Sequence, residues 1–147
     1  DPTYTISKPN TRGQAFYTTE QTDPDVIATD NATRETTAVG ELISMSRYFK
    51  DQSRQLTVPV MVLVGEDDFV VCGGDLDCND HAAVIEHETA FYPSSACPEI
   101  YVLDDTNHNA NLHLNAGEAF VLMQDWINRR VGSAGKPPSD PCGANRG

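Results

Sequence analysis

The sequence predicts a mixed α/β domain organised around a buried parallel sheet. Residues 58–64 (VPVMVLV) are apolar apart from one early proline, and Gly65 ends the run. A nearly unbroken Val/Leu/Met run that stops at glycine is typical of a strand covered on both faces. In such sheets, ligands bind beyond the carboxyl ends of the strands. The acidic residues that follow, Glu66, Asp67 and Asp68, therefore stand where a site is expected.

The residues before this run predict two helices. Residues 1–23 show no sustained periodicity and predict an irregular surface segment. Asp23 and Pro24 suit the N-cap and first position of a short helix over 24–30. Apolar residues spaced by three and four predict a longer helix over 36–50. The residues of its apolar face are Val39, Leu42, Ile43, Met45, Ser46 and Phe49.

A helix and a second strand follow the acidic turn. Residues 81–91 (HAAVIEHETAF) predict a helix, with Asn79 or Asp80 as its N-cap. Residues 99–103 (EIYVL) predict a short strand, and the polar loop over 104–114 after it carries two histidines.

The last helix is predicted over 115–131. Asn115 and Glu118 form a pair like a capping box, with Asn in place of the usual Ser or Thr. Arg129 and Arg130 suit its negative carboxyl end. The residues predicted to line its apolar face are Ala119, Phe120, Met123, Trp126, Ile127 and Val131.

These elements divide the chain into three parts. Residues 1–57 form an irregular and helical segment, 58–131 an α/β core with two late parallel strands and flanking helices, and 132–147 a tail. Two buried parallel strands do not make a stable sheet alone. We therefore expect a missing N-terminal chain or segment to complete the fold. A first residue other than methionine suggests a processed product or a fragment.

Charge and hydropathy exclude two classes of partner. The 147 residues suit one domain and carry a formal charge of -12, with a pI near 4.4. This acidity disfavours binding to nucleic acid or to anionic membrane surfaces, since both require cationic patches. No apolar run approaches the ~20 residues that span a bilayer.

Cysteines and one sequon favour a secreted, extracellular protein. The four cysteines allow three pairings. We favour Cys72–Cys78 as a loop clip and Cys97–Cys142 as an anchor for the tail. A zinc site is the alternative, but the sequence has no Cys-x-x-Cys and the spacings match no common zinc pattern. Asn31 begins an N-glycosylation sequon. Disulfides form in oxidising compartments.

The ends of the two strands predict an acid–base pair. Neighbouring parallel strands bring their carboxyl ends to one edge, so Asp68 and His108 are expected within hydrogen-bond reach of each other. A carboxylate that holds the Nδ1–H of a histidine fixes the tautomer and leaves Nε2 free to accept a proton from a nucleophile. Asp67 is the alternative acid and His113 the alternative base.

Residues 58–131 resemble the C-terminal part of the α/β-hydrolase fold. In that family the triad acid lies in a Gly-x-x-Asp-like turn after a strand, which 65–68 (GEDD) match with Asp68 at the acid position. The triad histidine lies in the loop before the final helix, which 107–109 (NHN) match, with Asn in place of the usual glycine before His108.

The nucleophile of that family is missing from this chain. Its Gly-x-Ser-x-Gly elbow appears nowhere in the 147 residues. The resemblance therefore implies the C-terminal chain of a secreted serine hydrolase that cleaves carboxylic esters or lactones. Its partner would be the N-terminal chain of the same precursor, carrying the serine. No metal or cofactor is expected.

Two other functions remain open. A peptidase or epoxide hydrolase of the same fold would use a different nucleophile or substrate. A non-enzymatic, acidic, secreted binding module is the second, and calcium could stabilise it. Asp75, Asp77 and Asn79 read D-x-D-x-N and Glu86 falls at the twelfth position, as in a calcium loop. Asp80, however, stands at the sixth position, where that loop requires glycine.

Overall fold

The computed structural model describes residues 3–132 and residue 142, and only the backbone of residues 45–51. Most of the predicted tail over 132–147 lies outside the described residues, as do the side chains predicted at Met45, Ser46 and Phe49.

The described chain is a mixed α/β structure with five α-helices and two small sheets. Its elements are β1 (Tyr4–Ile6), α1 (Arg12–Phe16), α2 (Pro24–Ala32), β2 (Thr36–Ala38), α3 (Val39–Ser53), β3 (Met61–Gly65), α4 (His81–Thr89), β4 (Glu99–Leu103) and α5 (Ala116–Arg130), with short 3-10 turns at Thr19–Gln21, Ser94–Ala96 and Ala110–Leu112. Among these residues, no helix has the length and apolar character needed to cross a membrane.

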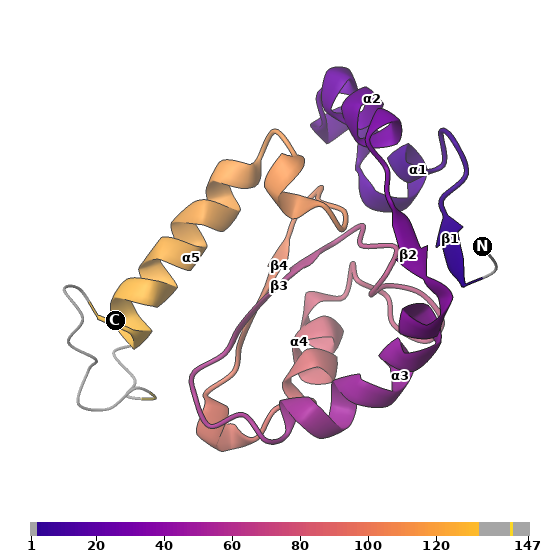
Figure 1. Cartoon of the computed structure of the whole chain (residues 1–147). Coiled ribbons are helices and arrows are strands. Elements are labelled where there is room, and N and C mark those ends of the chain that lie inside the picture. The colour runs from indigo at the N-terminus through magenta and orange to yellow at the C-terminus, as the bar shows by residue number, and fades with distance from the viewer. Residues whose placement is uncertain (1–2, 133–141, 143–147) are drawn as a thin grey trace.

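The predicted pair of parallel strands is confirmed. β3 pairs with β4 in a register that runs from Met61 opposite Glu99 to Gly65 opposite Leu103. α4 and α5 lie on opposite sides of this pair (Figure 1). No other strand in the described residues joins it, so the sheet is as narrow as the sequence predicts.

The second sheet was not predicted. β1 pairs antiparallel with β2, with Tyr4 opposite Ala38 and Ile6 opposite Thr36. The prediction of an irregular segment over 1–23 is therefore wrong, because this segment also contains α1. Since β2 takes Thr36–Ala38, α3 begins at Val39 rather than at residue 36.

The helix starts agree with the predicted caps in two cases of three. The Asp23 side chain accepts the N–H of Asp25 at the start of α2, and Asp80 accepts the N–H of Ala83 at the start of α4. The capping box predicted for α5 is wrong, because the Asn115 side chain makes no cap bond. Its amide instead donates to the carbonyl of Asp104, 2.9 Å away, which ties the helix to the preceding loop.

Both predicted disulfides are present. Cys72 is bonded to Cys78 and Cys97 to Cys142, with Cα atoms 5.5 and 5.4 Å apart. Cys78 is buried together with Val64 of β3 in the core. The other members of this core cluster are Val84, Val62, Val71, Cys72, Leu76 and Val102. The first disulfide thus fixes the loop that follows β3 to the main apolar core.

The predicted apolar faces of α3 and α5 are only partly covered within this chain. Ala119 is buried on α5, but Phe120 is 51% exposed and Ile127 is 43% exposed. On α3, Leu42 and Ile43 are also exposed. Large apolar side chains on one face of a helix normally pack against another element. These apolar side chains of α3 and α5 are therefore only partly covered by the described residues.

A cluster of charged side chains fastens α5 to β4. The Glu99 carboxylate accepts from Arg129 Nη1 at 3.0 Å and from Arg130 Nε, and Tyr101 Oη donates to it at 2.8 Å. Burial would raise the pKa of Glu99, but the hydrogen bonds from these three side chains outweigh it and lower the pKa.

This cluster predicts a pH-dependent stability. Because the pKa of Glu99 is lower in the folded state, its stabilising effect is full above the unfolded pKa of about 4.3 and disappears as the pH falls through the folded value. Glu99→Gln should lower the free energy of unfolding by about 1–2 kcal/mol at pH 7. Chemical denaturation at several pH values should show that the difference in the free energy of unfolding between the parent and Glu99→Gln becomes smaller below pH ~4. Glu118→Gln, at an exposed site on α5, is the control, and an equal effect there would contradict the assignment.

Candidate active site

The loops that follow β3 and β4 are in direct contact. A Cβ atom at Gly65 would lie 2.1 Å from the carbonyl oxygen of Thr106, so only glycine fits there. The N–H of Glu66 donates to the carbonyl of Leu103, and the N–H of Asp67 donates to that of Thr106, both at 2.9 Å. The abrupt glycine at the end of the apolar run therefore has a structural cause: it lets the two loops close on each other.

This contact brings Asp68 and His108 together as predicted. Nδ1 of His108 lies 3.0 and 3.1 Å from the two carboxylate oxygens of Asp68. Asp68 is buried, with 5% of its surface exposed. Its Oδ1 also accepts the N–H groups of Val70 and Val71 at 2.8 and 3.1 Å. These donors replace the water that a buried carboxylate loses.

The geometry defines the chemical state of the imidazole. An ionised carboxylate only accepts hydrogen bonds, so Nδ1–H of His108 is the donor in its contact with Asp68, and in the neutral ring the lone pair is on Nε2. Nε2 makes no hydrogen bond within the described residues, and the His108 side chain is 41% exposed. A buried carboxylate, an oriented imidazole and an open Nε2 can act together as a general base.

Asn107 holds the histidine loop against the acid loop. Its side-chain oxygen accepts the N–H of His108 at 2.7 Å and the N–H of Phe69 at 3.2 Å. These two residues directly follow Asn107 and Asp68 in the chain. The asparagine that departs from the family pattern therefore forms a bridge between the loops, a role that glycine lacks the side chain to fill.

The alternative acid and base have other partners. Asp67 is exposed and accepts a hydrogen bond from Thr18 Oγ1 at 2.8 Å. His113 is 4% exposed and bonds to backbone groups on Thr18, Asn107 and Asn109. Within the described residues, neither side chain is hydrogen-bonded directly to the other or to the side chains of Asp68 and His108.

The N-terminal segment contributes side chains that the sequence reasoning missed. The Phe16 ring lies 5.7 Å from the His108 ring, centroid to centroid, at a tilt of 44°. Its carbonyl accepts the N–H of Asn109 at 3.0 Å. The Arg12 guanidinium lies 4.8 Å from the centroid of the Phe16 ring and pairs with Asp30 at 2.6 Å. No local pattern indicates that Phe16 packs on the histidine loop, because Phe16 is more than 90 residues from His108 and Asn109 in the chain.

A separate polar cluster lies at the same edge of the sheet. Ligand-type atoms of Glu66, His81 and Asp104 lie within 4.8 Å of one another. Nε2 of His81 is 3.7 Å from Glu66 and 3.8 Å from Asp104, and the Asp104 side chain is 79% exposed. These are the side chains in the described residues that could hold a cation, and a protonated His81 could equally bridge the two carboxylates.

The calcium-loop residues are arranged differently. Asp77 accepts two hydrogen bonds from Asn79, one from the backbone and one from the side chain. These bonds hold the pKa of Asp77 below its usual value. Asp80 caps α4. Asp77, one of the residues of the predicted calcium loop, therefore stabilises a local turn, and Asp80 at the sixth position of that loop caps the helix.

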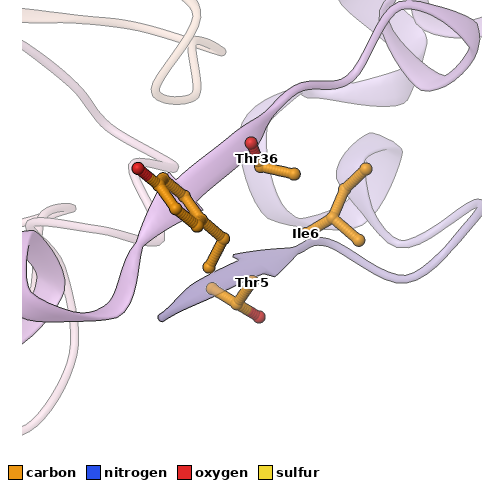
Figure 2. Close-up of a pocket in the computed structure, with 4 residues that line it drawn as sticks. Thr5, Ile6 and Thr36 are labelled. Carbon is orange, nitrogen blue, oxygen red and sulfur yellow. The ribbon is translucent and has the colours of Figure 1, made fainter. Parts of the chain in front are cut away.

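The hollow between β1 and β2 carries no acid–base chemistry. Its volume is about 390 Å³, and Tyr4, Thr5, Ile6 and Thr36 line it. Figure 2 shows Thr5 and Ile6 on one strand and Thr36 on its neighbour. No carboxylate, imidazole or thiol is among these lining residues.

The predicted glycosylation residue lies near the end of α2. The Asn31 amide nitrogen donates to the carbonyl of Ile27 at 3.0 Å, and its oxygen accepts the N–H of Asn10 at 3.1 Å. Glycosylation at Asn31 remains a prediction.

Because comparison of the sequence with known proteins finds no match, the site is interpreted from its geometry. No family model matches the chain, and no curated protein matches it.

The contact at Gly65 predicts a costly substitution. Gly65→Ala must separate the two loops, because the added Cβ collides with the backbone of Thr106. Overpacking of this kind costs about 1–3 kcal/mol of stability. Gly117→Ala is the matched control, since a Cβ there meets nothing within 4 Å. Chemical denaturation of both variants checks the prediction, which fails if Gly65→Ala is as stable as the control.

Proposed function

We propose that this chain supplies the acid and the base of a secreted serine hydrolase that cleaves carboxylic esters or lactones. The observation that carries the proposal is the contact between the buried Asp68 carboxylate and Nδ1 of His108, at 3.0 Å. The open Nε2 on the other side of the ring is the second requirement for a general base. The order of the acid and the histidine along the chain agrees with the α/β-hydrolase pattern.

The reaction needs a hydroxyl group next to Nε2 of His108. In this proposal Nε2 accepts the proton of a serine hydroxyl as the serine oxygen attacks the ester carbonyl. Asp68 stabilises the resulting imidazolium through Nδ1–H. The imidazolium then gives its proton to the departing alcohol, and an acyl-serine forms. A water molecule, activated by the same nitrogen, releases the acid and restores the serine.

The serine is proposed to come from another polypeptide segment. Gly-x-Ser-x-Gly does not occur in these 147 residues, and Nε2 of His108 bonds to no hydroxyl group in the described part of the chain. The oxyanion donors would belong to the same partner segment. This proposal makes the chain one half of a composite active site.

Two surface features support such a partner. β3 and β4 form a two-stranded parallel pair with no further strand beside them in the described residues, and a free strand edge can pair with another chain. Phe120 and Val121 on α5 are 51% and 64% exposed. A partner segment could pair with a free strand edge of this sheet and also cover the exposed apolar side chains of α5. The two disulfides support an extracellular location.

Substitution of the pair tests the proposal. In the native protein, purified with any chain that accompanies it, Asp68→Asn should lower kcat for an activated ester by roughly 10⁴-fold and His108→Ala by roughly 10⁶-fold, because removal of the acid or the base of a triad has costs of this size in serine hydrolases. His87→Ala is the control, since His87 lies exposed on α4 beside Glu88.

Folding and catalysis are measured separately for the two variants and the control. Circular dichroism shows whether each variant is folded, and initial rates give kcat and KM. Folded His108→Ala protein with unchanged ester turnover would refute the role of His108. Equal losses in His87→Ala would mean that the assay reports folding rather than catalysis.

A further inference from the structure

A second histidine is buried beside the candidate catalytic pair. His113 is 4% exposed, and its ring lies 6.0 Å from that of Tyr17, centroid to centroid, in a stacked arrangement. Both ring nitrogens are engaged. Buried polar side chains are normally hydrogen-bonded, so the partners of His113 show which parts of the backbone it holds.

The bonds of His113 define its tautomer. Nε2 lies 3.0 Å from the backbone nitrogen of Thr18 and 3.2 Å from that of Asn107, and both are N–H donors. Nε2 is therefore the acceptor, and the proton is on Nδ1. Nδ1–H donates to the carbonyl of Asn109, 2.9 Å away.

Two of these three partners flank His108 in the chain. Asn107 precedes it and Asn109 follows it. The ring of His113 is thus hydrogen-bonded to the backbone on both sides of His108. His108 itself is on the surface side of this loop, with 41% of its side chain exposed. Its orientation toward Asp68 depends on the path of the backbone over residues 107–109.

The third partner connects this loop to the N-terminal segment. Thr18 donates its N–H to His113 and its hydroxyl proton to Asp67, the neighbour of Asp68. The segment therefore touches the histidine loop through His113 and the acid loop through Asp67. Both loops that carry the candidate pair are held from the same side.

We propose that His113 is a positioning residue for His108: its Nε2 lone pair fixes the backbone that aims the catalytic imidazole at Asp68. The proposal rests on the proposed function for its effect on turnover. It goes beyond that function by assigning a second histidine, buried and bonded to backbone groups through both ring nitrogens, to the control of the base.

Two amide substitutions separate the acceptor from the donor. In Gln the side-chain oxygen can reach about the position of Nε2, whereas in Asn the amide group reaches only about the position of Nδ1. His113→Gln therefore retains an acceptor for Thr18 and Asn107, and His113→Asn retains only the bond to Asn109. His87→Gln, at an exposed position on α4, is the control.

The expected result is a difference in kcat between the two variants. In the native protein, His113→Gln should stay within about threefold of the parent. His113→Asn should lose up to about 10²-fold in kcat with little change in KM, since small displacements of a catalytic group have effects of this size. Equal kcat values in the two variants, at any level, would overturn the proposal.

A spectroscopic readout keeps this test independent of the proposed function. The Nδ1–H proton of His108, hydrogen-bonded to Asp68, should give a protected downfield NMR signal in the parent and in His113→Gln. The signal should broaden or shift in His113→Asn. An unchanged signal in His113→Asn would refute the positioning role. If His108→Ala kept full turnover, the proposed function would fail, while this signal would still decide the role of His113.

Discussion

The loops after β3 and β4 leave the sheet in contact because Gly65 has no side chain. A Cβ atom there would lie 2.1 Å from the Thr106 carbonyl oxygen, and the parallel register sets Gly65 opposite Leu103 at the last pair of the ladder. This close approach allows Asp68 and His108 to meet at 3.0 Å. The bridge through Asn107, the disulfide beside the acid loop and the bonds of His113 all act on loops that this contact has already brought together.

The polar side chains of the candidate site are hydrogen-bonded, whereas apolar side chains on α5 remain exposed. At the carboxyl ends of the strands, each charged or amide side chain of the candidate site has a partner, and the buried carboxylate of Asp68 has two backbone donors as well as the imidazole. On α5, apolar side chains such as Phe120 remain half exposed. A preorganised acid–base pair beside uncovered apolar surface is what one part of a composite active site requires, and this contrast supports the proposed partner segment.

The sequence predicts the core strands and helices because their apolar patterns are long or periodic. The features that it does not predict depend on contacts between residues far apart in the chain. The β4 boundaries and the meeting of Asp68 with His108 follow from apolar runs and from the geometry of parallel strands. β1 could not be foreseen, because three residues become a strand only by pairing with β2, whose residues lie 30 to 34 positions later in the chain. Asn115 has the side chain of a helix cap, yet it binds the carbonyl of Asp104. His113 gives no local signal, since its partner Thr18 is 95 residues away.

The most direct test of the account is to locate the nucleophile with a fluorophosphonate probe, which reacts covalently with activated serines. The native protein would be labelled, digested and analysed by mass spectrometry, in parent and His108→Ala forms. The account predicts one labelled serine outside residues 1–147, on a polypeptide segment associated with this chain, and loss of the label in His108→Ala. A label on a serine within these residues, or labelling that is independent of His108, would contradict it.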